Sequence, residues 1–371
     1  MSERNRSYLR FFLAAAITVV ILALAVPANA QAIIKVSDTI NVRFGMLLQA
    51  WADEQQIANT TGGTNGYAQN LFIRRVRFLM AGQVAKNVTF FLDTENANLG
   101  KGPKAVGTGF QLLDAYGSWD IAPEFSVQGG LILIPLCRDC NSSAAALLGL
   151  DYGLWSFQES APTQSSIGRD TGFQLKGLLA EKHLEYRIGA YSGFRQANAK
   201  NSFRYAGRLQ YNVFDVETAQ FYTTQYFATK KILAIGAGFD TQSSYYSFAG
   251  DVMLNLPVGK DAFTFQGDYI WYNGSTFFTA PGIRKQNVLF LEAGYYISAA
   301  KIEPFAVYQE QVYSNTGDKV LNKRAVQAGL SFYPFGNNLN FKLAWTGRKS
   351  PNDPNTANTN EFTLQMQVFY F

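Results

Sequence analysis

The chain has 371 residues and a formal net charge of +5, and 15% of its residues are aromatic, including 20 Tyr and 30 Phe. It contains one His and two Cys, too few for a zinc site built from His and Cys ligands. A hydrolase with a His base beside its nucleophile is disfavoured, because the only His, His183, is predicted to lie in a short turn. No Gly-rich phosphate loop precedes a helix, so nucleotide binding has no support.

The N-terminal segment has the three parts of a secretory signal peptide. Three Arg precede an apolar run at 11–26, and a small-residue cleavage site ends at Ala30. The pattern predicts a signal peptide over 1–30 and a mature chain over 31–371 that follows Sec export. A membrane anchor is the alternative, but the run is shorter than the roughly 20 residues of a spanning helix. Cleavage leaves 371 − 30 = 341 residues and removes three Arg and one Glu, so the charge falls from +5 to +3 and indicates no nucleic-acid partner.

The mature chain has no second long apolar run, which excludes helical membrane spans. Aromatic residues nevertheless recur along its whole length, Gly is frequent (32 residues), and no long stretch has helical periodicity. This combination fits an outer-membrane β-barrel of a Gram-negative bacterium. We therefore expect one all-β domain over 31–371, embedded in outer-membrane lipid.

Alternation of apolar and polar residues with period two predicts the strands. In the second segment, "FIRRVRF" at 72–78, Phe72 belongs to the apolar face and Arg75 and Arg77 to the opposite, inward face. Arg74 shares the apolar face, although an Arg at the membrane midplane costs about 2–4 kcal/mol. We expect Arg74 to reach the headgroups or a subunit contact.

The same pattern predicts sixteen antiparallel strands, at 40–50, 72–78, 88–95, 110–121, 124–134, 169–179, 184–193, 203–213, 232–242, 245–256, 262–273, 287–298, 302–313, 323–333, 338–348 and 359–371. The segment 220–228 also alternates. Counting it would give an odd number and would reverse the rhythm of short periplasmic turns and long external loops. We therefore interpret 215–231 as a longer connection on the periplasmic side.

The final strand, 359–371, has apolar residues at alternate positions and ends in Phe371. In lipid its free edge would leave backbone groups unsatisfied at several kcal/mol each, so it must pair with the first strand. The aromatic end resembles the assembly signal of outer-membrane barrels, which makes the barrel assembly machinery an expected partner. Phe371 itself is out of phase with the apolar series.

The connection at 135–168 does not alternate, and structureless connections of this length are usually functional. Its apolar residues at 144–148 and Leu150 need a surface to cover, and the inner wall of the barrel is the nearest. We predict that this third external loop folds into the pore and narrows it. Cys137 and Cys140 near its start favour a small disulfide loop in an exported protein, with free or mixed thiols as the alternative. No metal site or cofactor is expected.

Alternation also assigns equal numbers of cations and anions to the lumen: Arg43, Arg75, Arg77, Lys176, Arg187, Arg204, Arg208, Lys323, Lys342 and Arg348 against Asp93, Glu95, Asp114, Asp120, Asp170, Glu185, Asp251, Asp268, Glu292 and Glu310. Closure brings the cations of the first two strands near those of the penultimate strand. Arg138 in the long connection would add to this basic sector at the constriction. Because Arg binds oxyanions bidentately, the predicted solute-binding set is Arg43, Arg75, Arg77, Arg138, Arg204, Arg208, Lys342 and Arg348. The alternative is an ordinary polar porin wall.

Seven segments in order resemble the phosphate-selective porin O and P family: "FIRRVRF" at 72–78, "SVQGGLILIP" at 126–135, "RDTGFQLKG" at 169–177, "LEYRIGAYSG" at 184–193, "GRLQYN" at 207–212, "KKILAIGAGFD" at 230–240 and "EAGYYISAAKIEPFAVYQ" at 292–309. The resemblance covers most of the mature chain. It implies a sixteen-stranded trimeric porin whose third external loop enters the pore, and uptake of phosphate or polyphosphate along an arginine ladder. The connection starts "CRDCN", with one cation and Asp139, so we expect a preference for small anions rather than for phosphate alone.

The expected function is passive diffusion of small hydrophilic solutes through a homotrimeric outer-membrane porin that prefers phosphate or other oxyanions. A general-diffusion porin with little ion selectivity is the first alternative. A structural or adhesin barrel is the second, although it would be expected to carry larger external domains. An enzyme is not expected.

Overall fold

The computed structural model describes residues 33–371, except positions 38, 59–63, 103–108, 166, 196–199, 275 and 279–282. The predicted signal peptide lies outside these residues. The strands of the described part are β1 (Ile33–Lys35), β2 (Asn41–Ala58), β3 (Thr64–Ala85), β4 (Val88–Leu99), β5 (Gln111–Ala122), β6 (Phe125–Leu133), β7 (Arg169–Leu179), β8 (Leu184–Tyr191), β9 (Arg204–Asn212), β10 (Ile232–Gln242), β11 (Tyr245–Val258), β12 (Asp261–Tyr272), β13 (Gln286–Tyr296), β14 (Ile302–Tyr313), β15 (Lys323–Phe332), β16 (Leu339–Lys349) and β17 (Thr359–Tyr370). Two short 3₁₀ turns, η1 (Asp139–Asn141) and η2 (Thr316–Leu321), interrupt the connections. None of the helices in the described part is long and apolar enough to span a membrane.

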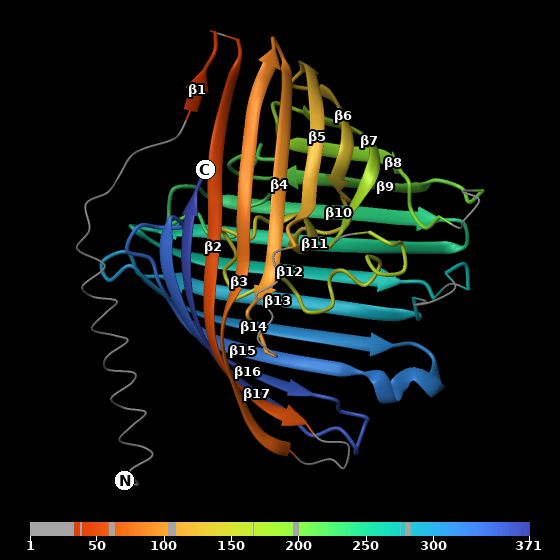
Figure 1. Cartoon of the computed structure of the whole chain (residues 1–371), viewed down its shortest axis with the longest axis vertical. Coiled ribbons are helices and arrows are strands. Elements are labelled where there is room, and N and C mark those ends of the chain that lie inside the picture. Colours follow the sequence, from red (N-terminus) through yellow and green to blue (C-terminus); the bar gives the residue numbers. More distant parts are fainter. Residues whose placement is uncertain are drawn as a thin grey trace. The chain divides into compact units, whose positions relative to one another are not determined.

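Strands β2 to β17 form one closed antiparallel barrel (Figure 1). Each strand pairs with the next in sequence, and β17 pairs with β2 from Glu361↔Gln55 to Tyr370↔Met46. The short strand β1 adds a hairpin to the start of β2. The sixteen-stranded all-β barrel and its closure by the first and last strands are therefore confirmed.

The two faces of the barrel differ as the alternation predicts. On β17, the Phe362 side chain is 52% exposed, whereas Thr363 and Gln365, which point the other way, are 1% and 0% exposed. Phe371 follows the second, polar-lined face, where the Arg43 guanidinium lies 4.1 Å from its ring centroid. This contact explains why the terminal aromatic residue is out of phase with the apolar series.

The prediction for Arg74 and Phe72 is wrong, because a β-bulge changes the phase of β3. Gln49 of β2 pairs with Arg75, and the next residue, Ala50, pairs with Ile73, so Arg74 is the extra residue. Beyond the bulge Phe72 is buried and the neighbouring Leu71 is 75% exposed. A bulge bends a strand and redirects side chains locally, which simple alternation cannot anticipate.

Short connections lie at one end of the barrel and most long ones at the other, as predicted. The turns that follow β3, β5, β7 and β11 occupy 86–87, 123–124, 180–183 and 259–260. The exception at this end is the connection at 213–231, which contains no strand, as the parity argument requires. At the opposite end, Ser243 and Ser244 alone join β10 to β11.

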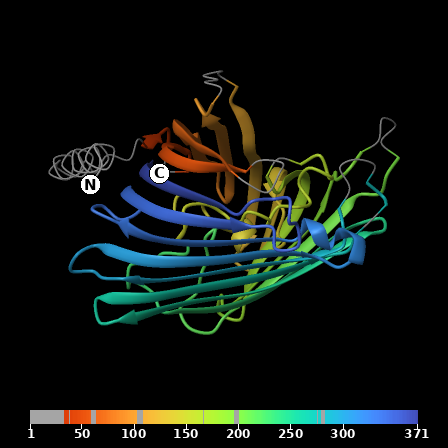
Figure 2. The same cartoon turned by 90° about the horizontal axis from the view of Figure 1, so that it is seen from below.

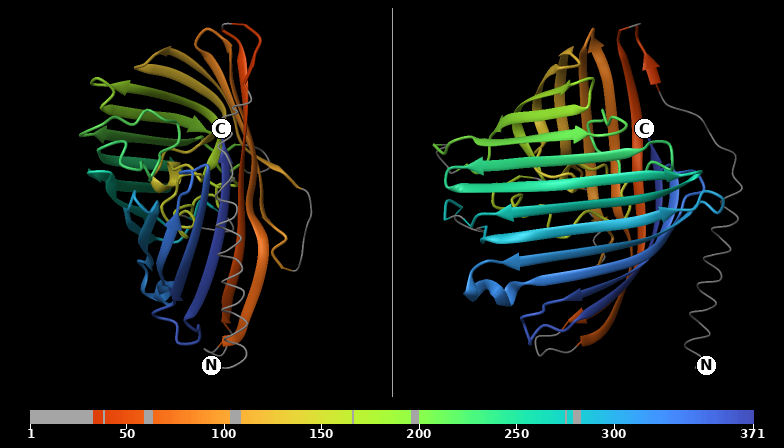
Figure 3. Two further views of the ribbon diagram at one scale, coloured as in Figure 1. Left: turned by 90° about the vertical axis from the view of Figure 1, so that its left-hand side faces the viewer. Right: turned by 180° about the vertical axis from the view of Figure 1, so that it is seen from behind.

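The strands of opposite walls cross at a large angle. Seen from below, β2 to β4 form one wall and β10 to β16 the other (Figure 2). From behind, β10 to β16 run side by side across the view (Figure 3). Such crossing follows from the tilt of strands in a closed barrel.

Candidate functional site

The connection between β6 and β7, residues 134–168, packs against the polar-lined face of the sheet. Apart from η1 its backbone is irregular, and most of its side chains are buried. Leu148 and Leu150 pack with Phe290 of β13 and Phe305 of β14. The apolar residues that needed a surface thus find it on the barrel strands.

Consecutive strands each provide one side chain that accepts a hydrogen bond from a backbone N–H of this connection. The bonds run from Arg138 to Asp251 of β11 (3.2 Å), Asp139 to Asp268 of β12 (2.9 Å), Gly149 to Glu292 of β13 (3.2 Å), Leu154 to Gln309 of β14 (2.6 Å) and Leu150 to Gln327 of β15 (3.2 Å). An unpaired buried N–H costs about 1–3 kcal/mol, so these acceptors stabilise an irregular backbone. Three carboxylates assigned to the lumen therefore serve the connection.

Side chains of β16, β17 and β2 donate hydrogen bonds to backbone carbonyls of the connection. Lys342 of β16 donates to the carbonyl oxygens of residues 147, 148 and 149 at 2.6, 3.3 and 2.7 Å. Gln367 of β17 donates to the carbonyl of Ala145 (2.9 Å), and Gln49 of β2 donates to that of Ala144 (3.1 Å). Lys342, one of the predicted solute-binding residues, is thus buried and holds the connection.

The bulge in β3 lets two consecutive arginines bind the same carboxylate of the connection. Arg74 donates from Nε and Nη2 to Asp151 at 2.8 and 2.7 Å, and Arg75 donates from Nη2 to the other carboxylate oxygen. Burial would raise the pKa of Asp151, but Arg75 and Arg74 outweigh it and hold the pKa well below its usual range. Arg74 is therefore an anchor and not a headgroup contact.

The next predicted residue, Arg77, is paired within the wall. It donates from Nε to Glu95 at 2.9 Å, and Nη1 lies 3.3 Å from Asp93. Both carboxylates belong to β4, and Glu95 stands directly opposite Arg77 in the β3–β4 register. The turn at 86–87 alone does not specify this pair, because the register shifts by one residue between Gln83 and Ala85.

Tyr222, in the connection at 213–231, lies at the centre of a cluster of three arginines. The guanidinium carbons of Arg138, Arg187 and Arg208 lie 4.8, 5.0 and 5.3 Å from the centroid of its ring, within the range of cation–π contacts. Sequence reasoning missed Tyr222, and the unusual length of this connection at the short-turn end was the available signal.

Each arginine of this cluster also has a carboxylate partner. Arg138 donates two hydrogen bonds to Glu217, at 2.8 and 2.7 Å, and is fully buried. Although burial favours the neutral acid, Arg138 lowers the pKa of Glu217. Arg208 donates to Asp251 at 2.7 Å, and Arg187 pairs with Glu185. The structure thus brings Arg138 and Arg208 together, with both charges compensated.

The two connections that start at opposite ends of the barrel meet through their backbones. Tyr222 donates its N–H to the carbonyl of Asn141 (2.9 Å), and its own carbonyl accepts from Ser143 (2.8 Å). Thr224 donates its N–H to the carbonyl of Ala146 at 3.2 Å. The residues at 213–231 are therefore part of the support of 134–168.

The remaining predicted residues lie apart from this cluster. Arg204 is fully buried and donates two 2.7 Å hydrogen bonds to Asp240 of β10. Arg348 of β16 is 2.5 Å from Glu361 of β17, with about a third of its side chain exposed. Arg43 is exposed and covers the ring of Phe371. The predicted seam between the first and last strands exists. Arg75, Arg77 and Lys342 lie there, and each is bonded to a carboxylate or to a backbone carbonyl.

A disulfide bond joins Cys137 to Cys140 at the start of the connection, with their Cα atoms 5.1 Å apart. His183 lies at the end of the turn after β7, where its Nδ1 is 2.5 Å from the carbonyl of Asn212. Among the described residues, no group of three or more His, Cys, Asp or Glu is arranged to hold a metal ion.

No protein-family model matches this sequence. No curated protein matches it either. The fold, in contrast, is shared with solved outer-membrane proteins.

OprB of Pseudomonas putida superposes with a TM-score of 0.62 over 89% of this chain and 94% of its own, at 9% identity. The outer-membrane channel DcaP of Acinetobacter baumannii gives a TM-score of 0.58 over 91% of this chain and 99% of its own, also at 9% identity. The anion-selective porin from Comamonas acidovorans gives 0.58 over 89% of this chain and 100% of its own, at 12% identity. At these identities the likeness concerns the fold, and this chain has the barrel fold of these proteins.

Proposed function

We propose that this chain is an outer-membrane porin through which small hydrophilic solutes diffuse passively. The observation that carries the proposal is a closed barrel that exposes apolar side chains on one face and bears polar ones, with a long packed connection, on the other. A closed barrel leaves no open strand edge in lipid, and a polar lumen is what a water-soluble solute requires. The shared fold with channels such as DcaP adds support.

The connection at 134–168 is the proposed constriction. Hydrogen bonds to side chains of β2, β3, β9 and β11 to β17 surround it on most sides, which supports a place within the lumen. Its fixed position would limit solute size, and the ion pairs of Asp151 with Arg74 and Arg75 and of Arg138 with Glu217 would keep it there. Solutes would pass along the wall that it leaves uncovered.

The expected anion preference remains a proposal with arguments on both sides. The resemblance to phosphate-selective porins and the fold shared with an anion-selective porin favour it. The pairing of Arg75, Arg77, Arg138, Arg204 and Arg208 with carboxylates weighs against a free arginine ladder, because a paired guanidinium must lose a partner before it can bind an anion. A general-diffusion porin with weak selectivity is therefore the second candidate.

We also propose how the chain is exported and assembled. A signal peptide over 1–30, Sec export, insertion by the barrel assembly machinery and a homotrimeric state all follow from the sequence patterns and the resemblance. Chemical cross-linking of the protein in native outer membranes would test the trimer, since a monomer would give no cross-linked species.

Planar-bilayer recording of the refolded protein tests the function. Step-wise, ohmic conductance is expected, and the reversal potential in a KCl gradient gives the ion preference. Anion preference with saturable block by phosphate would support the oxyanion form of the proposal. Ohmic current without block or preference would support the general-diffusion form. Absence of any conductance from correctly folded protein would remove the porin proposal and favour a structural or adhesin barrel.

A further inference from the structure

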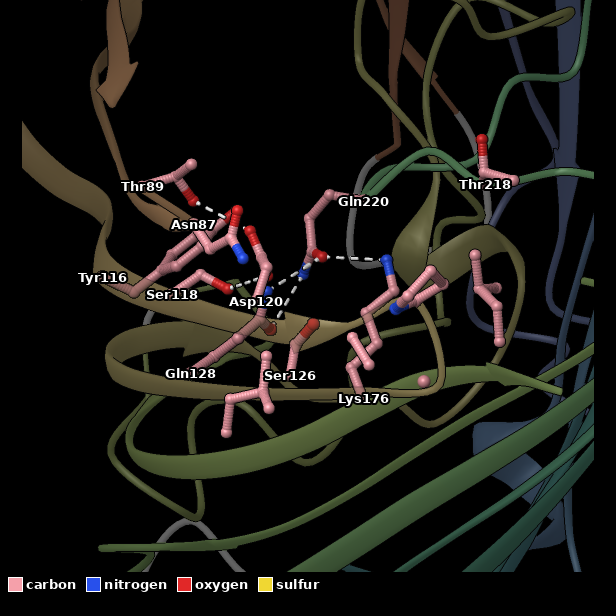
Figure 4. Close-up of a pocket in the computed structure, with 15 residues that line it drawn as sticks. Asn87, Thr89, Tyr116, Ser118, Asp120, Ser126, Gln128, Lys176, Thr218 and Gln220 are labelled. Carbon is pink, nitrogen blue, oxygen red and sulfur yellow. Dashed lines mark hydrogen bonds between the residues drawn. The ribbon is translucent and has the colours of Figure 1, made fainter. Parts of the chain in front are cut away.

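A polar cavity of about 540 Å³ lies at the short-turn end of the barrel. It is bounded by the ends of β4 to β7 and by residues of the connection at 213–231 (Figure 4). Its lining includes Tyr116, Ser118, Gln128 and Gln220. The volume is within the usual range of small-molecule pockets, about 300–1,000 Å³.

Two opposite charges face this cavity, from different strands. Asp120 of β5 accepts a hydrogen bond from Ser118 Oγ at 2.7 Å, and Lys176 of β7 donates from Nζ to Gln220 Oε1 at 3.1 Å. Figure 4 shows Asp120 and Lys176 with the Gln220 side chain between them. Gln128 donates to the same Gln220 oxygen at 3.3 Å, so the two amides and Lys176 form one hydrogen-bonded group.

Neither Lys176 nor Asp120 forms an ion pair within the described part of the chain. Within the described part of the chain, no carboxylate oxygen lies within 4.0 Å of Lys176 Nζ, and no Lys or Arg nitrogen lies within that distance of the Asp120 carboxylate. Arg187, which stands opposite Lys176 in the β7–β8 register, is instead paired with Glu185.

This difference decides which charges can meet a solute. A solute that binds a paired Arg must first break a buried ion pair, which costs about 3–5 kcal/mol. A solute carboxylate at Lys176 would replace only a neutral amide, and a solute ammonium at Asp120 would add to a hydroxyl contact. Both exchanges gain a charge-assisted hydrogen bond, which is stronger than the neutral one.

We infer that this cavity is a binding site for small dipolar solutes that carry one anionic and one cationic group, of the size of an amino acid or dipeptide. The anionic group binds Lys176, the cationic group binds Asp120, and the amides of Gln128 and Gln220 accept and donate along the solute between them. This inference rests on the proposed porin function and names its solute class. It also makes Lys176 and Asp120, rather than the arginines, the residues that set ion preference.

The test is planar-bilayer recording of the whole protein and of Lys176→Met and Asp120→Asn, with glycylglycine as the dipolar probe and sorbitol as the uncharged one. Glycylglycine is expected to reduce the current of the wild type at lower concentration than sorbitol does. Each substitution is expected to raise the half-blocking concentration by about tenfold, the effect of losing one hydrogen bond to a charged group. In a KCl gradient, the two substitutions are expected to change the K⁺/Cl⁻ permeability ratio by about twofold in opposite directions.

Exposed turn residues supply matched controls. Lys260→Met and Glu181→Gln make the same kinds of charge change at the short-turn end, outside this cavity, and should leave block and permeability ratio unchanged. Lys176→Arg keeps the charge and should restore block even if Lys176→Met inserts poorly.

Opposite shifts with dipeptide-specific block support the inference. A conducting wild type that glycylglycine blocks no better than sorbitol, or substitutions that leave the permeability ratio unchanged, would overturn it while leaving the porin proposal intact. Silence of the wild type and of every variant would instead overturn the porin proposal on which the inference depends.

Discussion

Two groups of strands in the barrel use polar and charged side chains for different purposes. Along β11 to β17 and β2 to β3, acids, amides and lysine bind the connection at 134–168 (for example Glu292, Gln327 and Lys342). Along β4 to β7, Asp120 and Lys176 face a cavity. Lys342 donates to three backbone carbonyls, whereas Lys176 donates to the side-chain amide of Gln220. The role of a polar lumen residue therefore depends on how completely a connection fills the space in front of it.

The largest effect is expected from breaking the buried pair on the covered side. Arg138→Met leaves Glu217 buried without its cation, which costs about 3–5 kcal/mol. We expect the connection at 134–168 to become loosely packed, with faster amide hydrogen exchange there and a larger, noisier single-channel conductance.

The matched control is the double variant Arg138→Met/Glu217→Gln, which removes both charges. It should recover part of the protection, because no charge is left unpaired in the cluster. If Arg138→Met alone leaves hydrogen exchange at 134–168 unchanged, the pair does not hold the connection.

A second change removes the cationic anchor on β16. Lys342→Met deletes three hydrogen bonds and leaves the carbonyls of residues 147–149 short of donors, for a cost of about 2–4 kcal/mol. Hydrogen exchange should rise at 147–152 first. Lys323→Met, at an exposed position of β15, is the control and should have no effect on this region. Equal exchange in the two variants would contradict the anchoring role.

The third and smallest effect depends on pH. Burial raises the pKa of the Glu159 carboxyl to about 7, against the opposing attraction of Arg204. Because this pKa is above the ordinary value of 4.5, the packed state binds more protons than the unpacked state between these pH values. Packing of the connection should therefore weaken as the pH rises from about 4.5 to about 7, by on the order of 2 kcal/mol.

Hydrogen exchange at 155–168, corrected for intrinsic rates, measures this weakening between pH 5 and pH 8. Glu159→Gln should abolish the pH dependence, since an amide keeps the contact with the Tyr272 hydroxyl without ionising. A pH dependence that survives the substitution would assign it to another group.

The sequence was sufficient to predict the barrel, because the alternation of apolar and polar residues is a local signal that repeats in every strand. Alternation located all sixteen strands of the closed barrel, and the parity argument kept 220–228 out of the sheet. The bulge at Arg74 was not visible, because an extra residue in a strand leaves the alternation on each side intact and only shifts its phase.

The roles of the arginines were harder to predict from the sequence, because each role depends on a partner that is distant in sequence or lies on the neighbouring strand. The turn at 86–87 joins β3 and β4, but a register shift between Gln83 and Ala85 sets the pairing of Arg77 with Glu95, and such a shift is not visible in the alternation. The contact of Arg138 with Glu217 joins two connections, and that of Lys342 with residues 147–149 spans almost 200 positions (195 to Leu147). No local pattern specifies such contacts.

The closure of the barrel also bears on the order of events during folding. Gln49 of β2 binds both Gln367 of β17 and the carbonyl of Ala144, so one side chain joins the first strand, the last strand and the long connection. The residues Gln49 and Gln367 are 318 positions apart, and contacts across such separations form late. In a chain without β17, the residues of β2 that pair with β17, Met46 to Gln55, are unpaired, and the set of side chains that bind the connection is incomplete. The barrel interior is therefore expected to form after the sheet. A chain truncated before β17 should have neither a closed sheet nor a packed connection at 134–168.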